Sequence, residues 1–466
     1  MGHPPLISIG GDHMKKTRAT RVGALLVGLA LVGAACGGDD GETSSTEAPA
    51  GSEAPSSEAP ASGGELEGMT GTTPKGADVS EEWTSALSAF WEGKGNAALE
   101  DFSYAAEAYD AAVVIALAVE KAGTDGAAHA NEIVGITKDG TKCTTFAECL
   151  QIIKDGGDPD YDGISGPLDF NGNGEPLKGS YAVQTFGADN RLDASLETLV
   201  AIEAPAALVV ELQTSTATRE GDGVLKIGSL LPETGSLAFL GPPEFAGVEY
   251  AIEEINAAGG VLGKPIEYSQ GDSGDTSTDI ASTTSDRLIS ENVDAIIGAA
   301  SSGVTLTVID KITAAGITMF SPANTSPALS DYADNALYFR NAPSDLLQGA
   351  VLADLITADG NASVYILNLD DAYGNGLANA VAAVLGDGSV EVLGQKAYDP
   401  AATTFDAEIA EIVAADPDAI VLITFEEGSR ILRGLVEAGI GPKVKKVYGV
   451  DGNMGNALGE SFDASE

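Results

Sequence analysis

The feature that most constrains the fold is a regular alternation between short apolar runs and longer segments of helical periodicity. Apolar runs rich in Val and Ile, typical of buried strands, occur at 225–231, 266–268, 293–297, 317–320, 363–367, 419–423 and 444–448. Between most of them, apolar residues recur at helical spacing, as at 248–255, 276–291, 345–358, 373–386, 404–414 and 427–438. Repeated strand–helix–strand units predict an α/β fold with parallel sheets and helices on both faces. Ligands of such sheets bind beyond the carboxyl ends of the strands.

The composition excludes several kinds of partner and site. The chain of 466 residues has 24 Lys and Arg against 70 Asp and Glu, a formal net charge of −46. Nucleic acid and anionic lipid surfaces are therefore unsuitable partners, because both are bound through clustered basic residues. Three cysteines are too few for a disulfide scaffold or a four-thiolate zinc site. The sequence holds no Walker motif, dinucleotide fingerprint or metal-spaced histidines, so no cofactor and no metal are predicted.

The N-terminal region has the parts of an export signal. A basic cluster within 15–21 precedes the apolar run 22–35, which ends in small residues directly before Cys36. This arrangement is typical of a secretory signal and is too short to span a bilayer; a short buried helix is the alternative. We interpret 1–13 as an upstream leader that fits no part of a signal, 14–35 as the signal peptide, and 36–65 as an acidic, disordered tether. Cys36 resembles the acylated cysteine of bacterial lipoproteins.

Motifs in the body of the chain resemble the periplasmic leucine/isoleucine/valine-binding protein family. Residues 223–466 resemble the N-terminal two-thirds of that family, through 226–232, 254–260, 297–302, 321–325, 371–376 and 448–452. Residues 66–192 resemble its C-terminal third, through 66–69, 103–109, 166–170 and 179–181. The resemblance implies a two-lobed type I periplasmic binding fold, in which each lobe is a parallel sheet flanked by helices and the ligand lies in the cleft.

The order of these parts is unusual, because the C-terminal third of the family comes first in this chain. A circular permutation accounts for the order, since it is tolerated when the old ends can be bridged and the new cut lies in a loop. A misassembled gene with swapped halves is the alternative. Residues 193–222 match neither part and are interpreted as a linker. Lobe one is expected at about 83–160 plus 223–340, and lobe two at about 341–466 plus 66–76 and 163–190.

The resemblance also implies the chemistry of the pocket. A receptor for a free amino acid needs hydroxyls and backbone N–H groups for the carboxylate, and an acid with an aromatic wall for the ammonium. Ser302 and Thr325, with the backbone at Ala300 and Ala323, match the family's carboxylate cradle. Asp451 matches the acid that holds the ammonium group. The alternatives are a helix cap for Ser302 and a turn aspartate for Asp451.

Four further positions match residues of the family that surround the ligand. Tyr373, Phe425 and Tyr104 match aromatic positions, and Phe425 stands where a tyrosine is often found. Leu240 aligns with an aromatic residue that covers the ligand. For each aromatic residue, core packing is the alternative.

The predicted function is that of an exported substrate-binding protein without enzymatic activity. It would deliver an amino acid, of branched-chain type first, or a related small amide to an ABC importer by cleft closure. Its partners would be the ABC permease, the ATPase subunits and a membrane, the last through a lipid anchor at Cys36. We expect a monomer at the cell surface or in the periplasm. A sensory domain of the same fold that signals without transport is the alternative, and a surface hydrolase is a third hypothesis.

Two motifs of other chemistries are also present. Residues 271–274 resemble the nucleophile segment of trypsin-like proteases, which requires a histidine base, and the only histidine after the signal is His129. Residues 169–174 begin like a calcium loop, but the twelfth position is Ser180 where that loop has glutamate, so a hairpin turn is favoured.

The remaining two cysteines, Cys143 and Cys149, are separated by six residues. Export would place them in an oxidising compartment, where we expect a disulfide. Two buried thiols are the alternative.

Overall fold

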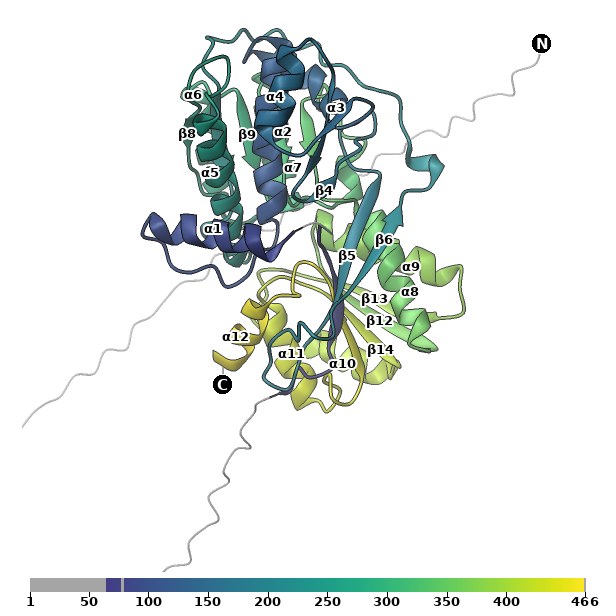
Figure 1. The fold of residues 1–466 in the computed structure, drawn as a ribbon. Helices are drawn as coiled ribbons and strands as arrows, with labels where there is room; N and C mark the ends of the chain where they lie inside the picture. The colour runs from purple at the N-terminus through teal and green to yellow at the C-terminus, as the bar shows by residue number, and fades with distance from the viewer. Residues whose placement is uncertain (1–63, 77–78, 465–466) are drawn as a thin grey trace, which may run out of the picture. The chain divides into compact units, whose positions relative to one another are not determined.

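The computed structural model describes residues 64–76 and 79–464 (Figure 1). The predicted leader, the signal peptide, Cys36 and nearly all of the tether lie outside the described residues. Within the described ranges, none of the helices is both long and apolar enough to cross a membrane.

One sheet has seven strands and is built from both ends of the described chain. Its strand order is β13 (Glu391–Tyr398), β12 (Ser363–Leu369), β14 (Ala419–Ile423), β15 (Lys446–Gly449), β1 (Thr70–Pro74), β5 (Lys178–Thr185) and β6 (Thr198–Glu203). The pairs from β13 to β1 are parallel, and β5 and β6 add antiparallel strands at one side. The helices of this lobe are α8 (Asp345–Ala358), α9 (Ala372–Gly386), α10 (Asp406–Ala415), α11 (Gly428–Glu437) and α12 (Asn456–Ala464).

A second sheet has five strands, all parallel. Its order is β11 (Tyr338–Arg340), β10 (Thr318–Ser321), β9 (Ala295–Gly298), β7 (Lys226–Leu230) and β8 (Glu267–Ser269). The helices of this lobe are α1 (Glu81–Gly93), α2 (Ala105–Ala122), α3 (Ile133–Ile136), α4 (Phe146–Lys154), α5 (Gly241–Ala257), α6 (Ile280–Ser290) and α7 (Ser302–Ala314). A separate small sheet has three strands, in the order β2 (Thr141–Cys143), β3 (Pro159–Gly163) and β4 (Gly166–Pro167).

Four strands of the five-stranded sheet are almost wholly buried, and the edge strand β8 is not. Ile297 packs in one core with α2 and α5, whereas its neighbour Ile296 packs in another with α7. Successive side chains of a strand point to opposite faces, so a run of consecutive apolar residues is what a doubly covered strand requires. Figure 1 shows α2 and α5 side by side over this sheet. The predicted α/β fold with parallel sheets flanked by helices is confirmed.

The N-terminal described segment completes both lobes. β1 pairs in parallel with β15 and in antiparallel with β5, which places residues 70–74 in the interior of the seven-stranded sheet. α2 instead packs against α5 in the other lobe. Since β1 is paired on both sides within the sheet, this segment belongs to one folded unit with 224–464.

Two expected boundaries differ from the structure. Residues 163–190 were expected wholly in lobe two, but Leu168 and Phe170 pack in the core of lobe one, where Phe170 lies 6.0 Å from Phe320 between ring centroids. Only β5 of this segment joins the seven-stranded sheet. The interpretation of 193–222 as a plain linker is also wrong in part, because it contains β6, paired with β5 over six residues. β6 is short and exposed, so no buried face marks it in the sequence.

Candidate ligand-binding site

One pocket brings together all nine residues that the sequence predicts to bind ligand. It is lined by Tyr104, Leu240, Ala300, Ser302, Ala323, Thr325, Tyr373, Phe425 and Asp451, and by Leu237, Ser301 and Gly452, which were not predicted. The residues of the five-stranded sheet follow β9 and β10, and those of the seven-stranded sheet follow β12, β14 and β15. The pocket thus lies beyond the carboxyl ends of parallel strands from both sheets. That these residues bind ligand stays a prediction.

An acid with two tyrosine partners forms one part of the pocket. The hydroxyl of Tyr104 donates to Asp451 Oδ2 at 2.7 Å, and the hydroxyl of Tyr373 donates to Oδ1 at 2.7 Å. The N–H of Gly452 in turn donates to the Tyr373 oxygen at 3.2 Å. Desolvation raises the pKa of Asp451, and the hydrogen bonds from both tyrosines offset part of that rise. A carboxylate held in this way is oriented to accept a cationic group.

Hydroxyls and a helix start form another part of the pocket. The hydroxyl of Ser301 caps α7 by accepting from the N–H of Val304 at 3.3 Å. Ser302 is therefore the first residue of the helix and not its cap, and its hydroxyl accepts from the N–H of Ser326 at 3.3 Å. Thr325 is buried on the neighbouring strand end. Hydroxyls at the start of a helix suit a carboxylate, because the helix dipole and free N–H groups favour an anion there.

Aromatic and aliphatic side chains close the pocket. The rings of Tyr373 and Phe425 stack with centroids 5.4 Å apart and planes 9° apart. Leu237 and Leu240 belong to the same buried cluster as these two rings. Because Phe425 has no hydroxyl, this wall offers apolar surface and one tyrosine oxygen.

Tyr104 reaches the pocket from an unusual backbone conformation. It precedes α2 with φ of 58°, in the left-handed region that a bulky residue rarely adopts. Such a conformation persists only where the surroundings enforce it. Here the side chain is buried and bonded to Asp451.

Gly452 lines the pocket at a position where the backbone passes close to its neighbours. A Cβ atom at this position would lie 2.6 Å from the carbonyl oxygen of Thr424 and 3.0 Å from the Tyr373 hydroxyl. Only glycine allows the chain to pass so close to the ring that holds Asp451.

The motifs of other chemistries have structural roles. His129 is fully buried, with Nδ1 2.9 Å from the carbonyl of Gly126 and Nε2 2.9 Å from the Thr318 hydroxyl. Burial lowers its pKa to about 4. At the calcium-like segment the N–H of Asn171 donates to the carbonyl of Glu175 at 2.9 Å, closing a turn. Across the described ranges no group of three or more His, Cys, Asp or Glu side chains is arranged to hold a metal ion.

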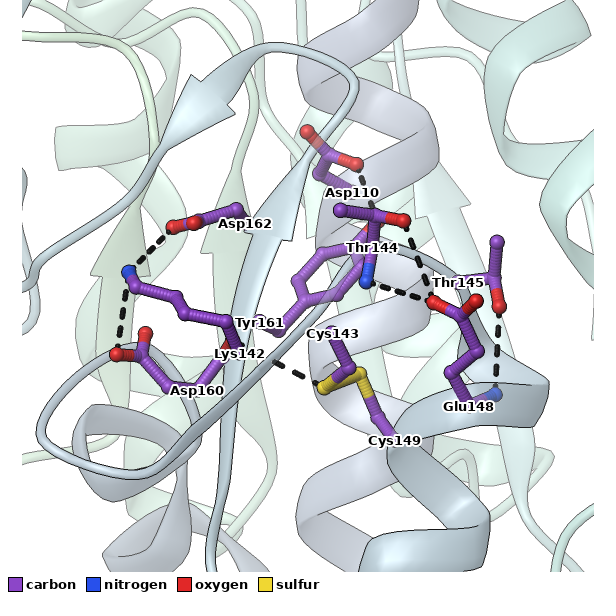
Figure 2. Close-up of a disulfide and its surroundings, with 10 residues drawn as sticks. All are labelled: Asp110, Lys142, Cys143, Thr144, Thr145, Glu148, Cys149, Asp160, Tyr161 and Asp162. Atoms are coloured by element: carbon purple, nitrogen blue, oxygen red, sulfur yellow. Dashed lines mark hydrogen bonds and ion pairs between the residues drawn. A yellow bond between two sulfur atoms is a disulfide. The ribbon is translucent and has the colours of Figure 1, made fainter.

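Cys143 and Cys149 are joined by a disulfide at the start of α4 (Figure 2). Both cysteines are buried against α2 in the core of lobe one. Lys142, beside the bridge, pairs with Asp160 at 3.1 Å and Asp162 at 2.8 Å.

The family follows from comparison with known proteins. The profile of the family described as periplasmic binding protein matches residues 224–463, more than half of the chain. The chain belongs to this family. The resemblance noted in the sequence is thus confirmed, and residues 64–223 of this periplasmic binding protein lie outside the matched range although they supply β1, β5 and β6.

Several curated proteins are similar in sequence to this periplasmic binding protein. A Leu/Ile/Val-binding protein homolog 3 of Brucella melitensis is 26% identical over 219 residues, covering 46% of this chain and 59% of that protein. A Leu/Ile/Val-binding protein homolog 7 of Brucella abortus is 27% identical over 265 residues, covering 55% and 65%. The chemotactic signal transduction system substrate-binding protein BasB of Halobacterium salinarum is 31% identical, covering 42% and 49%. The chain spans less than two thirds of the length of each.

Solved structures also align with part of the chain. The branched-chain amino acid transporter substrate-binding protein LivJ of Streptococcus pneumoniae, in complex with isoleucine, is 28% identical with a TM-score of 0.46, covering 51% of this chain and 67% of its own. The leucine-binding protein LivK of Thermotoga maritima is 24% identical with a TM-score of 0.47 and the same coverage.

Proposed function

We propose that this chain is an exported substrate-binding protein for a free amino acid, of branched-chain type first, or a related small amide. The observation that carries the proposal is the pairing of unlike chemistries in one pocket. Asp451, which accepts hydrogen bonds from two tyrosine hydroxyls, suits a cationic group of a ligand. The hydroxyls of Ser302 and Thr325 suit a carboxylate. An α-amino acid presents these two groups one carbon apart, and Leu237 and Leu240 offer apolar surface to its side chain.

Cleft closure is the proposed mode of action. Lining residues come from strand ends of both sheets, so a ligand that fills the pocket contacts both lobes at once. A state in which the lobes are apart loses the contacts that one of the lobes would make. The ligand therefore shifts the equilibrium toward closure by its differential affinity. The closed form is what a permease would recognise.

Delivery to an ABC importer is part of the same proposal. The names of the Brucella relatives support a role in binding branched-chain amino acids. An acylated Cys36 followed by a polar tether would hold the domain at a membrane near the permease and its ATPase subunits.

A sensory role is the second candidate, and one comparison favours it. The relative from Halobacterium salinarum is named as part of a chemotactic signal transduction system. The two roles share the pocket and closure and differ in the partner. A permease and ATPase encoded beside this chain would favour transport, whereas a neighbouring kinase would favour signalling.

The order of the chain is also part of the proposal, as a circular permutation of the family fold. One side chain supports it by contacting both proposed ends. Asn190 Oδ1 accepts from the N–H of Leu66 at 3.0 Å, and its Nδ2 donates to Asp463 at 2.7 Å. The start of the first segment thus lies beside the helix that ends the second, as a joined chain in the usual order would require.

The test of the binding function is identification of the ligand. Native mass spectrometry of the purified chain should show a co-purified small molecule with an α-amino acid mass. Calorimetry with a panel of amino acids and amides should then rank leucine, isoleucine and valine first. A chain that is folded by circular dichroism and binds no member of the panel would contradict the proposed function.

A further inference from the structure

A second acid, Asp345, lies directly behind the pocket and has no partner for its charge. It is the first residue of α8 and is completely buried. In the described part of the chain no donor meets full hydrogen-bond geometry with either of its carboxylate oxygens, although the Thr325 hydroxyl lies close enough to lower its pKa in part. Its backbone N–H donates to the carbonyl of Thr325 at 2.8 Å, and Thr325 lines the pocket. Burying an ionised carboxylate without hydrogen-bond donors costs free energy. Such a group either takes up a proton or lies close to a positive charge.

The groups that face Asp345 from other elements are mostly acidic or neutral. They are Asp451 after β15, Asp371 before α9, Tyr373 on α9, Tyr181 on β5 and Arg340 on β11. The hydroxyl of Tyr181 is buried and also has no hydrogen-bond partner.

The one cation of this set is engaged elsewhere. Arg340 Nε donates to Glu175 at 2.9 Å, and the rest of the guanidinium bonds Glu175, the carbonyl oxygens of Asn324 and Ser326, and the hydroxyl of Ser330. Its charge is therefore largely matched by Glu175. Burial raises the pKa of Asp345 well above its usual range, and the charge of Asp451 raises it further, while Thr325 and Arg340 offset part of the rise.

Two neighbouring buried carboxylates cannot both be ionised cheaply unless a positive charge joins them. An empty pocket therefore favours a state in which such a pair shares one proton. A ligand ammonium that binds at Asp451 brings the missing positive charge, so the proton is no longer needed.

We propose that Asp345 is a second acidic determinant of ligand choice, which with Asp451 holds one proton in the empty pocket and releases it to solvent when a ligand ammonium binds. This inference rests on the proposed function, because it deepens the same site. The pair favours ligands that carry a positive charge. It selects against analogues such as α-hydroxy acids, in which a neutral hydroxyl replaces the ammonium group. Their binding would leave the proton on the pair of acids.

The experiment measures proton release directly. Leucine is titrated into the full chain by calorimetry at pH 7 in phosphate and in Tris, whose different ionisation enthalpies reveal protons exchanged on binding. The variants are Asp345→Asn, which keeps the side-chain shape, and Glu244→Gln as a matched control. Glu244 on α5 is also fully buried with both oxygens unpartnered, but the acid that it faces is Glu107 and not Asp451.

The expected result separates the two acids. The wild type and Glu244→Gln should release up to about one proton, and in the range where the pair is protonated their affinity should rise about tenfold per pH unit. Asp345→Asn should release fewer protons and show a flatter profile, since Asp451 then has no second acid beside it and keeps the hydrogen bonds from its two tyrosine hydroxyls. It should also discriminate less between leucine and 2-hydroxy-4-methylpentanoate.

Two failures are distinguishable. If Asp345→Asn binds leucine with the same proton release and pH profile as the wild type, the role of Asp345 is overturned while the proposed function stands. If the folded wild type binds no amino acid, the proposed function itself fails.

Discussion

The hydroxyl of Tyr104 donates to Asp451 at 2.7 Å although 347 residues separate them in the chain. Tyr104 belongs to the segment before α2, and Asp451 follows β15. The first described third of the chain thus supplies one of the two donors that orient the acid of the pocket. Neither segment forms the candidate site alone.

Removing the acid should cost more affinity than removing a hydroxyl. Asp451→Ala leaves a bound ammonium without its partner, which typically costs about 2–5 kcal/mol. Thr325→Val removes one hydrogen bond to a charged group, worth about 1.5–3 kcal/mol. Calorimetry with the best amino acid of the panel should therefore rank Asp451→Ala below Thr325→Val.

The control for this pair is Asp387→Asn, an exposed acid at the far end of α9 from Tyr373. It should bind like the wild type. Unchanged affinity in a folded Asp451→Ala variant would rule out a ligand whose ammonium group binds at Asp451. A neutral amide would then be the favoured ligand.

The ion pair of Arg340 and Glu175 should make stability depend on pH. Burial alone would raise the pKa of Glu175, but Arg340 outweighs it and holds the pKa below its usual range. Its stabilising contribution is therefore present above the unfolded pKa of about 4.3 and is lost as pH falls through the lower folded value. Glu175→Gln should lower the free energy of unfolding at pH 7 by about 3–5 kcal/mol, because it leaves Arg340 buried and unmatched.

Urea unfolding of the wild type and Glu175→Gln from pH 7 to pH 3 checks this. The two curves should converge in acid. Glu197→Gln, which breaks a more exposed pair with Lys75, should cost about 0–1 kcal/mol. Equal costs for the two variants would contradict the buried role of Glu175.

The disulfide between Cys143 and Cys149 should add modest stability. Its loop is short, so the loop-entropy argument gives about 2 kcal/mol. Replacing both cysteines by serine should lower the melting temperature by a few degrees while ligand binding persists, since the bridge lies at α4 and not at the pocket. Mass spectrometry after thiol labelling of unfolded, unreduced protein should leave both cysteines unlabelled; labelling of both would show free thiols.

The anchor prediction concerns Cys36. In a host with lipoprotein processing, the wild type should partition with membranes and carry acyl chains on the cysteine, because diacylation plus the new N-terminus gives stable anchoring. Cys36→Ala should not be acylated. Recovery of unmodified wild-type protein from cells with intact processing would remove the claim, and Cys143→Ser serves as the cysteine control.

The permutation predicts that a reordered chain still folds. A chain that runs from 205 to 464 and continues with 66–204 keeps all strands of both large sheets and the pair of Arg219 with the buried Asp294. Because Asn190 already contacts Leu66 and Asp463, the new junction spans neighbouring residues. Circular dichroism and calorimetry should give a single unfolding transition and the same ligand ranking. An unfolded reordered chain would show that the present order is required.

Several parts of the fold could not be read from the sequence, for identifiable reasons. β13 has alternating exposure and carries Gln395 and Lys396, so it lacks the continuous apolar run that marked the interior strands. β6 is almost wholly exposed and depends on pairing with β5. Ser301 was overlooked because only one of two adjacent serines can cap α7, and the choice depends on where the first helical turn begins.

The sequence by itself determined the strand–helix alternation, and its motifs carried the resemblance to the family, which in turn implied the nine residues of the candidate pocket. Periodicity and short motifs are local properties of the chain, so both can be recognised before the fold is known. The tertiary structure decided what depends on distant partners. It places β1 between β15 and β5, bonds Tyr104 to Asp451, and buries the Asp345 carboxylate without a donor in full hydrogen-bond geometry. Whether a buried acid is paired depends on the groups that other elements bring to it, and no spacing along the chain records that.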